Sequence, residues 1–145
     1  MGRREARRKQ AGGAAVIEIL LIAVLGSIGA LVRYHLGGFV HTNANRALAS
    51  EADFPFGTLF VNALGSFILS LIAGLFSEGM IPHIFYVAIG AGFCGSLTTF
   101  STLAVDLQRF LRDGRFSFFA LHLLASAASG VGAALLGLAA AGIVR

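Results

Sequence analysis

Four long apolar stretches restrict this chain to folds that are stable inside a lipid bilayer. They run approximately over residues 16–40, 54–76, 81–111 and 116–144, and each exceeds the roughly 20 residues that a helix needs to cross the hydrocarbon core. The chain is 57% hydrophobic and only 12% charged, unlike soluble domains of this length. We therefore predict an integral membrane protein.

The apolar stretches lack the period-2 alternation of transmembrane strands, and a closed barrel would need at least about eight strands. Helices satisfy their backbone hydrogen bonds internally, as a bilayer requires. We predict an all-α fold with four transmembrane helices in one domain over residues 16–145, preceded by a flexible basic flank over residues 1–15.

The basic start, GRREARRKQ, is similar to the positive region of a secretory signal peptide. The apolar run behind it is too long, however, and has no clean cleavage site. We interpret this run as a retained first helix whose basic flank contacts lipid headgroups, and we expect no nucleic-acid partner.

Positive charge divides almost evenly between the two sides of the predicted bundle. Because an excess of Lys and Arg on one side sets the orientation of a membrane protein, this balance predicts insertion in both orientations. The side with both chain ends holds six (Arg3, Arg4, Arg7, Arg8, Lys9 and Arg145), and the opposite side holds four (Arg46, Arg109, Arg112 and Arg115), or five if Arg33 snorkels outward.

Glycine and proline predict where the helices begin and end. The first helix should stop near Gly37–Gly38, followed by a solvated loop over residues 41–53, and Pro55 should open the second helix. In the fourth helix, small residues recur at four-residue spacing, which predicts close packing against another helix. They are Ser126, Gly130 and Ala134.

The third stretch contains GFCGSLTTFSTL over residues 92–103, an unusual segment for a transmembrane helix. Its glycines weaken the helix, and its hydroxyl groups can bond to backbone groups that an interruption frees. A helix broken at mid-membrane would direct carbonyl oxygens at a common point, where they could coordinate a small cation. The alternative is a continuous, glycine-rich packing helix with internally bonded threonines.

The second stretch carries a polar stripe, in which Asn62 is costly in lipid unless it finds a partner. The amide offers two donors that suit an anion, although an interhelical hydrogen bond explains it equally well. The edge of an aromatic ring such as Phe100 can also attract an anion. Arg33 is the most deeply embedded basic residue and either snorkels outward or lines a vestibule. The stripe consists of Thr58, Asn62, Ser66 and Ser70.

Three motifs follow one another along the chain: GALVRY over residues 29–34, FGTLFVNALGSF over 56–67 and GFCGSLTTFST over 92–102. Together they resemble the bacterial Fluc fluoride channels, also called CrcB. A looser similarity at Ser126 and Gly130 extends the resemblance over nearly all of the chain except its basic start.

The resemblance implies an antiparallel dual-topology dimer with two fluoride pores and a structural sodium ion (Na⁺) at the interface. The backbone carbonyls of Gly95 and Thr98 from both subunits would hold the sodium, and Arg33 would lie near a pore entrance. Leu103 stands where the family usually has a second pore Phe. The implied pore residues are Asn62, Phe100, Ser101, Thr102 and Ser126, with Leu103 in the place of that Phe.

We therefore expect a non-enzymatic subunit that lets fluoride leave the cytoplasm passively across the bacterial inner membrane. A homodimer is favoured over a heterodimer with a homologous chain. One alternative is a proton-coupled antiporter of the small multidrug-resistance type, but this needs a carboxylate deep in the first helix, and Glu18 lies near its start. The other is a packing subunit that transports nothing.

Overall fold

The computed structural model describes residues 2–48 and 53–143. Within that part of the chain, four helical runs are long and apolar enough to cross a membrane, which confirms the predicted all-α, multi-pass architecture. These runs are Gly12–Ala47, Phe56–Ser77, His83–Arg112 and Phe116–Ala140.

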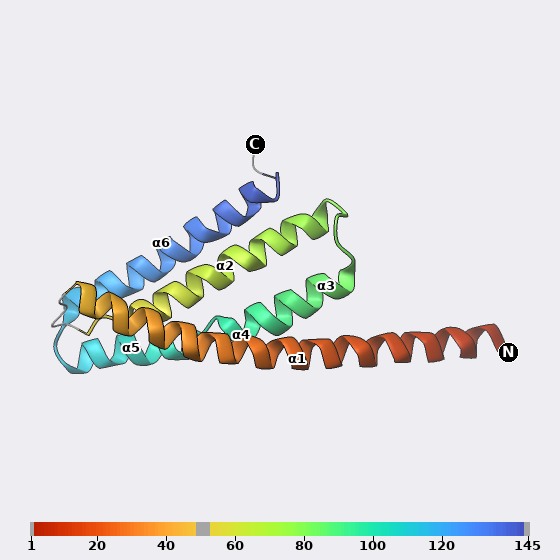
Figure 1. Ribbon diagram of the computed structural model, residues 1–145, viewed down its shortest axis with the longest axis horizontal. Helices are drawn as coiled ribbons and strands as arrows, with labels where there is room; N and C mark the ends of the chain where they lie inside the picture. Colours follow the sequence, from red (N-terminus) through yellow and green to blue (C-terminus); the bar gives the residue numbers. More distant parts are fainter. Residues whose placement is uncertain (1, 49–52, 144–145) are drawn as a thin grey trace.

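Helix α1 spans Gly2–Ala47 and projects at its N-terminal end well beyond the other helices (Figure 1). The backbone of the basic start is thus helical where it is described, and its flexibility stays a prediction. The expected stop near Gly37–Gly38 is wrong, because α1 continues for more than two further turns. The predicted positive residue Arg145 lies outside the described residues.

Two local features explain why α1 continues past these glycines. The side chain of Asn43 donates to the carbonyl of Phe39 at 2.8 Å, one helical turn back, so this part of the expected loop is helical. The backbone of α1 at Gly37 packs closely against Gly57: a Cβ on Gly57 would collide with the Gly37 carbonyl, whereas a Cβ on Gly37 would make only ordinary contacts. This part of α1 is thus in contact with a neighbouring element and remains helical.

Helices α2 (Phe56–Ser77) and α6 (Phe116–Ala140) lie side by side (Figure 1). Pro55 precedes α2, as predicted. A Cβ on Gly137 would collide with the Ser70 hydroxyl, and a Cβ on Gly130 would lie 3.8 Å from the Ser66 Oγ. The prediction that the Gly130 face of the last helix packs on another helix is confirmed.

The third run consists of four consecutive segments that are not one regular helix. A Cβ on Gly92 would lie 2.9 Å from the carbonyl oxygen of Ile22 in α1, so glycine is required for this close contact. Helical geometry stops after Leu97 and resumes at Phe100. The segments are α3 (His83–Val87), the π-helical η1 (Ala88–Cys94), α4 (Gly95–Leu97) and α5 (Phe100–Arg112).

An aromatic cluster lies where the α1–α2 connector meets α5 and α6. The Phe54 ring contacts the rings of Phe110, Phe118 and His122. The connector is held to α1 by Asn45, which accepts from the Phe54 N–H at 3.0 Å and donates to its carbonyl at 2.9 Å. This end of the molecule is therefore a well-packed support for the polar groups described next.

Candidate functional site

The third run is interrupted at Thr98 and Thr99, both of which have extended backbone angles. Thr99 caps the following helix, since its Oγ1 accepts from the Thr102 N–H at 3.2 Å. The same oxygen lies 3.0 Å from the Thr102 Oγ1 and 3.1 Å from the Ser101 Oγ. Thr99 is thus the hub of a hydroxyl cluster, a role that the sequence analysis did not assign to it.

Asn62 of α2 supports the interruption through the backbone of Thr99. Its Oδ1 accepts from the Thr99 N–H at 2.7 Å, and its Nδ2 donates to the Thr99 carbonyl at 3.1 Å. The amide therefore pairs with both polar groups of one residue that has left the helix. Asn62 thus makes an interhelical hydrogen bond, one of the two explanations that the sequence allowed. The contact uses one of the two N–H donors of the side chain. The role of Asn62 in a pore stays a prediction.

The interruption also changes the partners of two carbonyl groups. In a continuous helix the Thr99 N–H would donate to Gly95 and the Thr102 N–H would donate to Thr98. These donors go instead to the Asn62 side chain and the Thr99 hydroxyl. The Thr98 carbonyl accepts a long hydrogen bond of 3.4 Å from Arg33 Nη1.

Two pockets flank the interruption, and Thr99 lines both. The smaller pocket, of about 290 Å³, brings the predicted Asn62 together with Phe100 and Leu103. It is wide open, and the Phe100 side chain above it is 80% exposed. Its lining consists of Asn62, Ser66, Leu69, Thr98, Thr99, Phe100 and Leu103.

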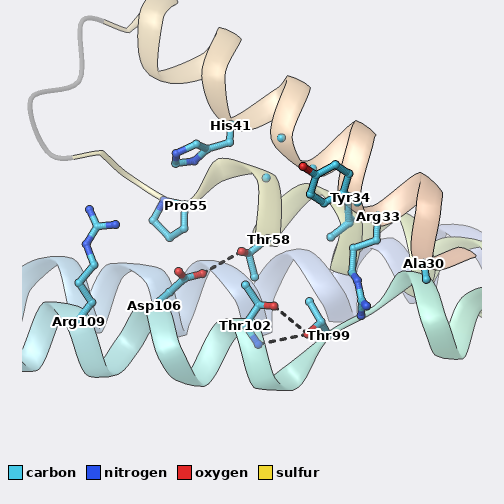
Figure 2. Close-up of a pocket in the computed structure, with 14 residues that line it drawn as sticks. Ala30, Arg33, Tyr34, His41, Pro55, Thr58, Thr99, Thr102, Asp106 and Arg109 are labelled. Atoms are coloured by element: carbon cyan, nitrogen blue, oxygen red, sulfur yellow. Dashed lines mark hydrogen bonds between the residues drawn. The ribbon is translucent and has the colours of Figure 1, made fainter.

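The larger pocket, of about 440 Å³, lies between α1, α2 and α5, as Figure 2 shows. Its wall carries a direct hydrogen bond of 2.8 Å from the Thr58 hydroxyl to the Asp106 carboxylate. Of the predicted site residues, Arg33 and Thr102 lie here. The lining consists of Ala30, Arg33, Tyr34, Gly37, Gly38, His41, Pro55, Gly57, Thr58, Val61, Thr99, Thr102, Asp106 and Arg109.

Two other predicted site residues lie apart from the pocket linings. Ser101 is exposed at the start of α5, next to the Thr99 hydroxyl. The Ser126 Oγ is buried on α6 and has no hydrogen-bond partner among the described residues. A buried hydroxyl without a partner is unusual, and the role of Ser126 in a pore stays a prediction.

Asp53 organises the charges at the edge of the larger pocket. Its carboxylate lies 2.8 Å from Arg109 Nη2 and 2.9 Å from His41 Nε2. The hydrogen bond from Arg109 lowers the pKa of Asp53 below its usual value of 3.8, against the effect of partial burial and with a further contribution from the His41 charge. Asp53 therefore stays ionised and holds two pocket residues at neutral pH.

The chain is similar to known proteins over most of its length. A family described as "CrcB-like protein, Camphor Resistance (CrcB)" matches residues 20–138. The chain is 42% identical to "Fluoride-specific ion channel FluC 2" of Geobacillus kaustophilus, over 84% of this chain and 91% of that protein. It is 38% identical to "Fluoride-specific ion channel FluC" of Geobacter metallireducens (77% and 86% covered) and 36% identical to that of Pyrococcus abyssi (74% and 81% covered).

Asn62→Ala should destabilise the protein, because both polar groups of the buried Thr99 backbone lose their partner. We expect a loss of about 1 to 3 kcal/mol, measured as a lower temperature of thermal unfolding in detergent. Ser66→Ala removes a hydroxyl one turn along the same helix and leaves the Asn62 pair intact, so it is the control. Equal unfolding temperatures for Asn62→Ala and the wild type would contradict this role.

Asp53→Asn should lower the unfolding temperature at neutral pH, where the wild-type carboxylate holds Arg109 and His41. Because folding lowers the pKa of Asp53, its contribution is present above about pH 3.8 and is lost as the pH falls through the folded value. The difference between the two proteins should therefore shrink below pH 3.8. Asp113→Asn, at the exposed pair with Arg112, controls for a general charge effect; a difference that does not change with pH would refute the assignment.

Proposed function

The chain belongs to the CrcB-like family, and we propose that it is a subunit of a fluoride-specific ion channel. It is not an enzyme: the relatives that cover most of its length are named as ion channels. As a channel it lets fluoride leave the cytoplasm down its gradient, which removes fluoride that has entered as HF and ionised inside. The protein is multi-pass, and the bacterial inner membrane is its proposed location.

The observation that carries this function is the interrupted third run with hydrogen-bond donors on its open face. Fluoride is small and tightly hydrated, so its path must offer donors that replace water. The hydroxyls of Ser101 and Thr102 surround the break, and Asn62 keeps one N–H beyond its bond to Thr99. With Phe100, whose ring edge is positive, these groups form the proposed pore wall, together with Ser126 from α6.

We propose that a second copy of the chain completes the pore. An open pocket with an amide and hydroxyl groups is unfavourable against lipid, and a ring as exposed as Phe100 suits burial in an interface. The near-even Lys and Arg distribution supports insertion in both orientations. An antiparallel homodimer is therefore favoured over a heterodimer, with Leu103 in the place of the family's second pore Phe.

A structural sodium ion fits the same interface. The Gly95 and Thr98 carbonyls are those whose helical donors are diverted, and carbonyl oxygens are suitable ligands for an alkali cation. The Thr98 carbonyl also accepts the long hydrogen bond from Arg33, so its second lone pair would bind the cation. Hard cations take about six oxygen ligands, more than this pair from one chain supplies. Equivalent carbonyls from the second copy would supply part of the remainder.

Purified protein in lipid vesicles should release fluoride and retain chloride, and it should do so with no proton gradient imposed. The physical reason is that donors at short range favour the small anion, whereas an antiporter depends on proton exchange. Ion-selective electrodes measure both anions in one sample, and protein-free vesicles give the background. Equal release of the two anions, or a strict need for a proton gradient, would refute the channel function.

A tag on the C-terminus should be accessible from both sides of the membrane in intact cells, because the charge balance permits both orientations. Labelling with a membrane-impermeant reagent before and after permeabilisation measures the two populations. The matched control adds three Lys residues after the C-terminus, which increases the excess of positive charge on the side with both chain ends. This change should move the tag toward the cytoplasmic side. Labelling of the unmodified chain from one side only would support a heterodimer instead.

A further inference from the structure

His122 of α6 is a buried titratable group that the proposed conduction path does not use. Its side chain is 0% exposed, and neither ring nitrogen has a hydrogen-bond partner among the described residues. The ring of Phe54 stands perpendicular to it at a centroid distance of 5.3 Å, and that of Phe110 lies at 6.2 Å. Burial of an unpaired polar group costs free energy. The contacts with the aromatic rings therefore do not explain why this position is a histidine.

The carboxylate of Asp106 lies close to the buried His122 ring. His122 Nε2 lies 3.8 Å from Asp106 Oδ2, about 0.6 Å beyond the range of N–H···O hydrogen bonds. The same Oδ2 accepts a hydrogen bond from the Thr58 hydroxyl, and both Asp106 and Thr58 line the larger pocket (Figure 2). Asp106 thus stands between the pocket and a buried ring that can carry a proton.

We propose that His122 and Asp106 form a proton-binding pair behind the wall of the larger pocket, and that its charge state sets the rate at which an anion enters. Histidine is the side chain whose charge ordinarily changes between about pH 5 and 8. With the ring neutral, the pair presents one negative charge to the pocket. With the ring protonated, the pair is neutral overall, and the Nε2 proton can be donated to Asp106.

The other charged groups near this pair have partners of their own. His41 of α1 and Arg109 of α5 both bind Asp53 of the connector, and Arg33 of α1 donates to the Thr98 carbonyl. Arg115 stacks on Phe118 and Phe110, next to the His122 ring. His41 is the histidine that lines the larger pocket, so its contribution to a pH effect must be separated from that of His122.

This inference rests on the proposed fluoride conduction. Removal of one negative charge from a pocket wall should increase anion entry on the order of fivefold, for a partly screened charge. Flux should therefore rise as the pH falls and the His122–Asp106 pair takes up a proton. The proton stays on the pair, so no proton needs to cross with the fluoride.

The experiment measures fluoride efflux from vesicles at equal pH inside and outside, between pH 5.5 and 8, after subtraction of the HF leak through protein-free vesicles. The proteins are the wild type, His122→Asn and Asp106→Asn, each checked for dimer formation by gel filtration. His83→Asn, at the opposite end of the bundle, is the matched histidine control and should keep the wild-type profile. All variants are repeated with His41→Asn to remove the other imidazole of the pocket.

We expect a rise on the order of fivefold for the wild type at low pH, a flat profile for His122→Asn, and a flux that is already high at pH 8 for Asp106→Asn, which removes the negative charge of the pair. A flat wild-type profile would overturn the proposal, and so would a His122→Asn profile as steep as that of the wild type. If His122→Asn does not assemble, the wild-type and Asp106→Asn profiles decide. Absence of fluoride flux at every pH would refute the channel function itself, which is a different result.

Discussion

The interruption of the third run, and the polar groups around it, depend on the two hydrogen bonds between the Asn62 side chain and the backbone of Thr99. Inside a bilayer, a helix cannot release backbone groups unless something else binds them. Asn62 does this for Thr99, and three consequences follow from the one contact. Thr99 is free to cap α5, the Gly95 carbonyl loses its helical donor, and the hydroxyl cluster faces the open side of the chain.

The interruption also needs neighbours that come close enough to hold it, and glycines provide this closeness. Gly92 lies against the backbone of α1, and Gly65 of α2 leaves room for the Thr98 methyl, with which a Cβ would collide. Lipid gives no hydrophobic drive for helix association, so close backbone contact is the main source of packing energy. Glycines on both sides of these contacts, Gly92 in the third run and Gly65 in α2, therefore let α1 and α2 stabilise the interrupted run.

The sequence predicts the elements of this fold better than their contacts. Helix number and the weak point near Thr98 follow from local composition, because apolar length and glycine content act within a few residues. The predicted end of the first helix was wrong. Gly37 lowers the local helix propensity, but its backbone packs against Gly57, twenty residues away in the chain. The partner of Asn62 could not be chosen in advance, since an amide suits both an anion and a peptide group. The positions of Thr99, Asp106 and His122 likewise depend on how three helices meet.

The charges around the larger pocket bear on how such a channel could select fluoride. The pocket lining holds Arg33, Arg109 and Asp106, and Asp53 lies at its edge, paired with Arg109. These four fixed charges cancel when the histidines are neutral. A pocket with no net charge concentrates anions weakly and draws chloride as well as fluoride. Discrimination must therefore arise further in, at donors close enough to replace water around a small ion. In the proposed channel, with this pocket as an entrance, the balance has an advantage in return: an ion that is weakly held there can leave again, and conduction requires sites that release what they bind.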